Sequence, residues 1–373
     1  MSDLKERMQS LDLLDPPELW HRVGARHVEL PREPRRGKVV AAVMLLAALA
    51  IAVLVRLSYR DSASEPIRPG PRPNGPIYFV SEADRITGSV GFYVVNEDGT
   101  GFKKLPAPTR SFGQIAVSPD GNHVAFATGG FDATSDIFMM RSDGTNVRRL
   151  TSDEPTGFLR GAHDNAPAWS PDGKRLAFAS TRCCDKPGTM GNRALYVMRA
   201  DGSGTKQITD GAIHVWEIAW APDGKSIAFT GLSGPIYLVQ PDGSNLRTIG
   251  GVDGRFIKDL AWSPDGTQIV YATEGRDPEG PTKWGSVPQD YQIRTINRDG
   301  TGETTIYRCD GLCRFSGYGV EWSPDGKRIA FLFGRVHGVG IDWFIGLVAP
   351  DGSGFRFLQT YKIQVRDFTW AAR

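Results

Sequence analysis

The sequence contains little of what most enzyme classes require. Only four cysteines and six histidines occur among 373 residues, and the histidines show no spacing typical of a metal site. We find no G-x-S-x-G nucleophile elbow, H-E-x-x-H motif or phosphate-binding loop. The net charge is only +2, whereas nucleic-acid-binding domains carry a strong basic patch. These absences favour a binding protein over an enzyme, and we expect no nucleic-acid partner.

Long apolar runs are also scarce, with one exception near the N-terminus. The stretch Val39–Val55 has no charged residue and lies between Lys38 and Arg56. As a helix it would measure roughly 26 Å, close to the ~30 Å of a bilayer core. We therefore predict one transmembrane helix at residues 38–57. A cleaved signal peptide or a buried core helix is the alternative, but the preceding region is long and no A-x-A site follows.

Basic residues predict the orientation of this helix. More of them precede the run than follow it, and the positive side of a membrane segment stays in the cytoplasm. Before the run are Arg22, Arg26, Arg32, Arg35, Arg36 and Lys38, and after it are Arg56, Arg60, Arg68 and Arg72. We therefore expect a single-pass plasma-membrane protein with a cytoplasmic N-terminus and an extracytoplasmic main domain.

Two short segments flank the predicted helix. Residues 1–37 form a cytoplasmic segment, in which Asp15 and Glu18 predict a capped helix start. This segment is either a docking helix or a membrane-surface or disordered tail. Residues 58–75 are rich in proline and predict a semi-rigid spacer. Residues 76–373 remain for the main domain.

A repeated hairpin dominates that domain. Residues 167–180 read PAWSPDGKRLAFAS, and related stretches occupy residues 115–128, 218–231, 260–273 and 320–333. The [S/A]-P-D-G core suits a type I turn, because proline fixes φ at the second position and glycine closes the fourth. The residues on both sides favour β structure, so each copy predicts a β-hairpin. The recurrence predicts a repeat architecture.

A second hairpin with an Asp-Gly turn alternates with the first. Its six turns begin at Asp98, Asp143, Asp201, Asp242, Asp299 and Asp351. One hairpin of each kind supplies four antiparallel strands, the content of one propeller blade. The first blade lacks an S-P-D-G turn, and residues 367–370 resemble an innermost strand without a hairpin. We therefore predict an all-β, six-bladed β-propeller closed by the C-terminal strand.

The A-W-S-P-D-G-[KR]-x-[IL]-A-[FY] pattern resembles the TolB-type WD40-like (PD40) propeller repeat, and its copies cover most of residues 77–370. The resemblance implies a six-bladed propeller outside the bacterial cytoplasm that binds proteins or cell-envelope components. The same repeats form the propeller of prolyl oligopeptidase-like enzymes. This sequence departs from TolB itself, because it has a predicted membrane anchor and no separate domain before the propeller. A role in the Tol–Pal system is therefore not implied.

The two faces of such a propeller differ. All S-P-D-G and Asp-Gly turns lie on one face, whereas links of unequal length lie on the other, which we call the variable face. Binding residues are commonly placed on loops of this kind. Exposed aromatic and basic side chains favour contact surfaces, and the candidates here are Arg160, His163, Trp284, Arg335, His337 and Trp343. Simple decoration of the rim is the alternative.

Acidic residues recur on the innermost strands. The position three before each strand's tryptophan is acidic at Glu217, Asp259 and Asp367, and Asp164 is close in sequence to a fourth such position. We expect these four carboxylates to gather at the channel mouth. They would bind a divalent cation or a basic group, or else form a solvated mouth without a ligand.

The cysteines fall into two close pairs. An even count outside the cytoplasm suggests disulfides. We predict a Cys309–Cys313 bridge, whereas Cys183 and Cys184 would form a vicinal bridge or stay free. A four-thiolate zinc site is a further alternative, which needs loops two blades apart to meet.

The sequence as a whole predicts a membrane-anchored binding module that presents its propeller to a protein or envelope ligand, with no catalytic residues and no required cofactor. The alternative is a metal-dependent hydrolase or lactonase that uses the acidic mouth.

Overall fold

The computed structural model describes residues 74–81, 91–106, 113–128, 135–152, 162–183, 192–231, 234–251, 253–275, 290–310, 313–314, 319–337, 340–358 and 365–371. These residues form β-strands and turns arranged in six sheets. Within them, no helix is long and apolar enough to cross a membrane. The predicted transmembrane helix at 38–57 and its flanking segments lie outside the described residues.

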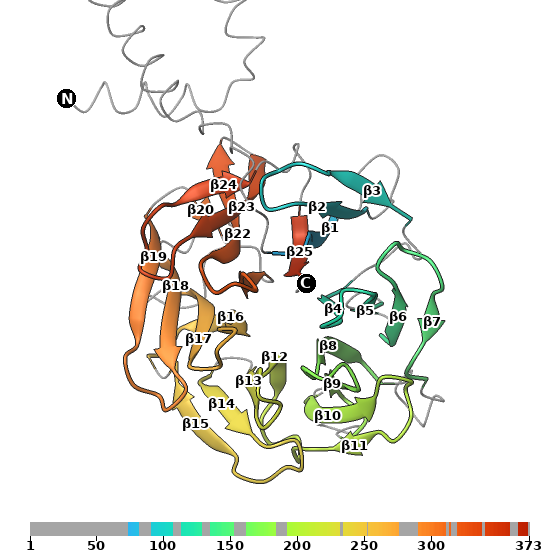
Figure 1. Cartoon of the computed structure of the whole chain (residues 1–373). Coiled ribbons are helices and arrows are strands. Elements are labelled where there is room, and N and C mark those ends of the chain that lie inside the picture. Colours follow the sequence, from blue (N-terminus) through green and yellow to red (C-terminus); the bar gives the residue numbers. More distant parts are fainter. Residues whose placement is uncertain are drawn as a thin grey trace, which may run out of the picture. The chain divides into compact units, whose positions relative to one another are not determined.

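The six sheets are the blades of one propeller (Figure 1). Blade 1 contains β25 (Val365–Trp370), β1 (Ile77–Ser81), β2 (Phe92–Val95) and β3 (Lys103–Leu105). Blade 2 contains β4 (Ile115–Val117), β5 (His123–Ala127), β6 (Ile137–Arg141) and β7 (Arg148–Arg149). Blade 3 contains β8 (Asp164–Trp169), β9 (Arg175–Ser180), β10 (Ala194–Arg199) and β11 (Lys206–Gln207).

The remaining blades follow the same antiparallel plan. Blade 4 contains β12 (Val215–Trp220), β13 (Ile227–Gly231), β14 (Ile236–Val239) and β15 (Arg247–Gly250). Blade 5 contains β16 (Phe256–Trp262), β17 (Gln268–Glu274), β18 (Asp290–Asn297) and β19 (Thr304–Asp310). Blade 6 contains β20 (Cys313–Arg314), β21 (Val320–Trp322), β22 (Ile329–His337), β23 (Gly340–Val348) and β24 (Arg356–Leu358). Here β20 and β21 both pair with β22.

The last strand closes the ring, as predicted. β25 pairs antiparallel with β1, from Ile77 opposite Trp370 to Val80 opposite Asp367. Figure 1 shows the red β25 beside the blue β1. Closure gives β1 a partner on both sides, so neither of its edges stays open for pairing with another chain.

Apolar residues pack between blades. The described residues form six buried apolar clusters, and each cluster joins two neighbouring blades. The inner-strand tryptophans belong to these clusters or pack against them, which confirms that they are packing residues: Trp169, Trp220, Trp262, Trp322 and Trp370. Three of their indole N–H groups also donate to the backbone of a neighbouring segment, such as Trp262 to the Ala219 carbonyl at 3.2 Å.

The S-P-D-G turns have the expected chemistry. In the turn at residues 170–173 the glycine N–H donates to the Ser170 carbonyl at 2.8 Å, and Gly173 has a φ of 66°. The Ser170 hydroxyl donates to Asp172 at 2.6 Å and accepts the Arg175 N–H at 2.9 Å. Hydrogen bonding by Ser170 holds the pKa of Asp172 below its ordinary value. The motif is therefore scaffold.

The chain enters the propeller through a tightly bound segment at residues 74–76. Asn74 donates its amide to Glu97 at 2.8 Å and accepts the Asp325 N–H of blade 6 at 3.0 Å. Trp370 donates to the Gly75 carbonyl at 3.1 Å. The entry segment thus contacts blade 1, blade 6 and the closing strand.

The Asp-Gly turns provide a test of backbone conformation. Four of the six turns have glycine two residues after the Asp-Gly glycine, and all four have positive φ: Gly101, Gly204, Gly302 and Gly354. The other two have Asn146 and Asn245, with φ of 53° and 56°. Only glycine and, to a lesser degree, asparagine adopt this conformation readily.

We therefore expect Asn146→Val to lower the free energy of unfolding by about 1–2 kcal/mol. Asn146→Gly should change it by only a few tenths. Urea unfolding of both variants measures the difference. Equal stability of the two variants would show that the left-handed backbone does not limit this turn.

Candidate functional site

A cavity of about 260 Å³ lies on the propeller axis. Its walls come from β4, β8, β12, β16, β21 and β25, the innermost strands of all six blades. The polar part of the lining consists of Gln114, Glu217, Asp259, Glu321, Asp367 and Thr369. Three of the four predicted channel acids therefore meet in one cavity.

Two of these acids bind the neighbouring blade. Asp367 of blade 1 accepts the Ile115 N–H of blade 2 at 2.8 Å. Asp259 of blade 5 accepts the Gly319 and Val320 N–H groups ahead of and within β21, both at 2.7 Å. Because one carboxylate oxygen of each acid is used in this way, Asp259 and Asp367 join blades. The position three before the tryptophan is thus partly a structural position.

Glu217 has a different environment. The Gln114 side chain accepts the Ala166 N–H at 3.1 Å and donates to one Glu217 oxygen at 2.8 Å. Gln114 thereby connects blades 2, 3 and 4. Glu217 is buried, with 6% of its surface exposed, and among the described residues its carboxylate binds the Gln114 side chain and no backbone N–H of the next blade. Its second oxygen is therefore left for the cavity.

Glu321 was missed by sequence reasoning. It lies one residue before Trp322, where blades 3, 4 and 5 have Ala168, Ala219 and Ala261 and blade 1 has Thr369. A glutamate at a position that otherwise holds small side chains was the available signal. Thr369 donates a hydrogen bond to Glu321 across the junction of blades 6 and 1. The site thus has a second glutamate, which comes from blade 6, two blades away from Glu217.

The four carboxylates influence one another. Burial, then the charges of Asp259 and Asp367, raise the pKa of Glu217 well above its ordinary value. The same causes raise the pKa of Glu321. Burial raises the pKa of Asp259 to about 6, although three backbone N–H groups oppose this effect. The cavity therefore disfavours several negative charges at once, and it would accept a positive group.

These shifts predict a pH dependence of stability. A carboxyl group with a raised folded-state pKa binds more protons in the folded state, so its contribution to stability falls as pH rises from the ordinary pKa, about 4, through the raised one. The variant with both Glu217→Gln and Glu321→Gln lacks this loss. We expect its Tm to exceed the wild-type Tm by a margin that grows from pH 5 to pH 8, at about 2–4 °C per kcal/mol.

Thermal unfolding by circular dichroism at both pH values measures this margin. Asp120→Asn is the control, because hydrogen bonding by Ser118 lowers the pKa of Asp120. Its Tm should lie below the wild-type Tm by the same margin at pH 5 and pH 8, because a lowered carboxyl pKa lies below both values. A margin for the double variant that is constant with pH would contradict the assignment.

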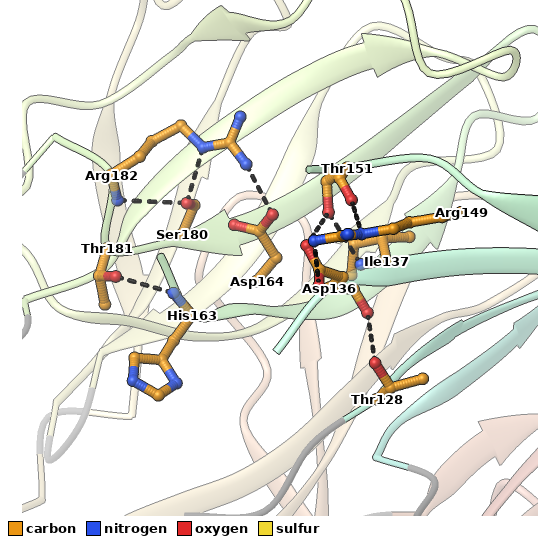
Figure 2. A network of polar contacts seen from close by, with 10 residues as sticks. All are labelled: Thr128, Asp136, Ile137, Arg149, Thr151, His163, Asp164, Ser180, Thr181 and Arg182. Atoms are coloured by element: carbon orange, nitrogen blue, oxygen red, sulfur yellow. Dashed lines mark hydrogen bonds and ion pairs between the residues drawn. The ribbon is translucent and has the colours of Figure 1, made fainter. Parts of the chain in front are cut away.

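Asp164 does not line the cavity, contrary to the prediction. Its side chain is fully buried and forms an ion pair with Arg182 at 2.6 Å (Figure 2). The Arg182 Nε also donates to the Ser180 hydroxyl at 3.0 Å. The guanidinium lies over the Phe178 ring, 5.2 Å from its centroid. Asp164 is two residues earlier than the cavity position Ala166, and the pairing of β8 with β9 is irregular between Asn165 and Ala168, where Ala166 has a φ of 52°.

The predicted variable-face residues are only partly described. The His163 N–H donates to the Thr181 hydroxyl at 2.9 Å, and its imidazole points away from Asp164 (Figure 2). Arg335, His337 and Trp343 lie at the far end of the β22–β23 hairpin, where the backbone alone is described at these positions. Arg160 and Trp284 lie outside the described residues. The loop-based part of the site stays a prediction.

Cys183 and Cys309 are both disulfide-bonded. Cys184 and the side chain of Cys313 lie outside the described set, so the Cys309–Cys313 pairing stays a prediction. Among the described residues, no group of three or more His, Cys, Asp or Glu side chains is arranged to hold a metal ion.

Comparisons with known proteins agree with the repeat pattern. Residues 159–280 match the model of the TolB beta propeller domain, PD40. An uncharacterized protein of Agrobacterium fabrum is 27% identical over 218 residues, which cover 54% of this chain and 68% of that protein. Dipeptidyl-peptidase 5 of Porphyromonas endodontalis is 31% identical over 142 residues, 36% of this chain. The match spans only 20% of the peptidase.

Among solved structures, TolB from Acinetobacter baumannii superposes with a TM-score of 0.60 at 20% identity, over 80% of this chain and 67% of that one. At this identity the likeness shows the fold. Together with the turn motif, the family match identifies residues 159–280 as TolB-type (PD40) β-propeller repeats within this six-bladed propeller.

Proposed function

We propose that the chain is a membrane-anchored extracytoplasmic binding module, whose ligand engages the channel mouth and places a basic group in the axial cavity. The TolB-like propeller fold supports a binding role. The proposal that the axial cavity binds a basic group rests on the hydrogen bonding of two glutamates. Glu217 and Glu321 line the cavity, and among the described residues neither carboxylate accepts a backbone N–H of the next blade, unlike those of Asp259 and Asp367.

A basic side chain of a protein or envelope ligand would suit this cavity. A lysine or arginine head group would offset the repulsion between carboxylates, and its N–H groups would donate to the free oxygens. The cavity volume of about 260 Å³ is below the usual range for whole small-molecule ligands. It fits one side chain projecting from a larger partner.

Co-purification from the cell envelope tests this proposal. The full chain is compared with the Glu217→Gln/Glu321→Gln variant, and bound proteins are identified by mass spectrometry. Asp253→Asn is the control, because Asp253 is an exposed acid that binds Arg294 at 2.6 Å, away from the cavity lining. We expect one or more partners on the wild type and the control that are lost from the double variant. Identical partners on all three would overturn the cavity as the contact site.

The membrane anchor is tested separately. Deletion of residues 39–55 should move the chain from the alkali-resistant membrane fraction to the soluble fraction. A label that cannot cross the membrane should reach the propeller in intact spheroplasts. Retention of the deleted form in the membrane would contradict the anchor.

A hydrolase is the second candidate, favoured by the resemblance to dipeptidyl-peptidase 5. In its metal-dependent form it requires a divalent ion at the acidic mouth. Metal analysis of the purified chain distinguishes the candidates: a stoichiometric ion that Glu217→Gln removes would favour the hydrolase.

A further inference from the structure

Blade 4 departs from the repeat on the face of the short turns. Its turn begins with Ala221, where the other four S-P-D-G copies have serine. Five residues later it has Ser226, where the other copies have the larger His123, Arg175, Gln268 and Arg328. The blade 4 turn therefore lacks the serine hydroxyl that binds the turn aspartate in the other copies. It also lacks a large side chain at position 226, directly before β13.

An arginine from blade 5 occupies part of this space. Arg298 precedes Asp299 in its turn, a position that holds Glu, Ser, Ala or Pro in the other blades. Its guanidinium binds Asp223 at 2.7 Å and the Ser226 hydroxyl at 2.8 Å, and it lies over the Trp262 ring at 5.4 Å. The charge of Arg298 is thus matched by Asp223 of blade 4.

A cavity of about 320 Å³ remains beside Arg298. Leu238 and Val239 form its buried floor. Its polar wall consists of Ser226, Gln240, Asn245, Arg247 and Arg298. No carboxylate belongs to the lining, so the two arginines present their guanidinium groups to the cavity, while Asp223 binds Arg298 and Asp299 interacts with Arg247 from outside it.

The wall offers hydrogen-bond donors. The Gln240 side-chain oxygen lies 3.1 Å from the Ser244 hydroxyl, which also has Asp242 as an acceptor at 2.7 Å, and the Gln240 amide NH₂ remains as a donor. Ser226 accepts from Arg298, which leaves its hydroxyl proton. One nitrogen of the Arg247 guanidinium donates to the Arg298 carbonyl at 3.2 Å, and its other N–H groups make no hydrogen bond to the described residues. A group that accepts several hydrogen bonds and carries negative charge would satisfy all three.

We infer that this cavity, which we call the blade 4–5 pocket, binds the C-terminal carboxylate of a peptide that ends in an apolar residue. A planar carboxylate matches the fork of an arginine guanidinium. Leu246 lies between the wall residues Asn245 and Arg247 in the sequence and is 46% exposed, one of two large apolar side chains so exposed among the described residues. It would contact the terminal apolar side chain. The pocket is separate from the axial cavity, so this inference does not depend on the proposed function.

A purely structural role for the arginines is the competing explanation, and blade 2 supplies the matched control. Arg148 has the same place in its blade as Arg247 and donates to the Ala200 carbonyl at 3.1 Å. Both arginines are exposed. Blade 2 has His123 in place of Ser226, and Ala200 stands in place of Arg298. If Arg148 and Arg247 only join neighbouring blades, replacement of either one should have the same effect on ligand binding.

Ligand-observed NMR titration of the full chain tests the pocket with N-acetyl-leucine, N-acetyl-leucinamide and inorganic phosphate. We expect saturable binding of N-acetyl-leucine, weakened about tenfold in Arg247→Gln by the loss of a charge-assisted bond. Arg148→Gln should bind like the wild type. Ser226→Gln places the blade 5 residue in the pocket and should abolish binding while the thermal unfolding temperature shows a folded chain.

Several results would overturn the inference. These are equal binding of the acid and its amide, equal losses in Arg148→Gln and Arg247→Gln, and no saturable binding of N-acetyl-leucine. Binding of phosphate without binding of the carboxylate would reassign the pocket to a phosphorylated ligand and reject the peptide terminus.

Discussion

A chain that lacks residues 365–373 is expected to lose cooperative unfolding and to aggregate. These residues include β25, which pairs with β1 and buries Val365, Phe368 and Trp370. Full burial of each such side chain stabilises by about 1.5–3 kcal/mol, so their sum approaches the 5–15 kcal/mol that separates a typical folded domain from its unfolded state. The loss also exposes the edge of β1 to other chains.

Circular dichroism melts and size-exclusion chromatography measure this effect. A synthetic peptide of residues 365–373, added during refolding, is the control. It should restore a cooperative melt and a monomeric elution volume. A truncated chain that melts like the full chain would show that five blades and an open sixth sheet are sufficient.

Asp164→Ala is expected to lower the free energy of unfolding by about 3 kcal/mol or more. Asp164 is fully buried and bound to Arg182, and removal of one partner of a buried pair typically costs 3–5 kcal/mol because the other charge is left without compensation. The lower end applies here, since the Arg182 side chain is 22% exposed and can regain some solvent. The Tm should fall by roughly 6–12 °C.

The neighbouring blade supplies a matched pair. Arg149 and Asp136 are 2.7 Å apart, and both pairs appear in Figure 2. The Arg149 side chain is 47% exposed, so solvent screens this pair. Asp136→Ala should therefore cost about 1 kcal/mol or less. Equal losses in the two variants, measured by urea unfolding, would show that burial does not determine the strength of these pairs.

The fold could be predicted because the turns are local and repeated. Ser170 and Asp172 make their bonds within six residues, and the four turns that begin with serine make the same bonds at almost the same distances. The closing strand was also predictable, because residues 367–370 carry an inner-strand pattern without a second strand of their own. Local chemistry and a count of strands were sufficient for six blades.

The site was harder to predict, because its contacts join distant blades. Gln114 and Glu217 are 103 residues apart, and only the ring brings the amide to the carboxylate. Asp164 was misplaced for a different reason: it lies before an irregularity of β8 between Asn165 and Ala168, and its partner Arg182 belongs to the same blade. Glu321 was detectable only by comparison of equivalent positions, and the same comparison reveals Ser226 in the blade 4–5 pocket.

The bonds around residues 74–76 have a mechanical consequence. Any pull exerted on the propeller through the preceding chain arrives at Asn74, which is bonded to Glu97 in blade 1 and to the backbone of Asp325 in blade 6. The load then divides between two blades before it reaches the β1–β25 seam. That seam is antiparallel, and force directed along its strands must shear several ladder bonds together rather than open them one at a time. The hydrogen bonds of Asn74 and of the β1–β25 ladder thus resist separation of the two ends of the propeller chain.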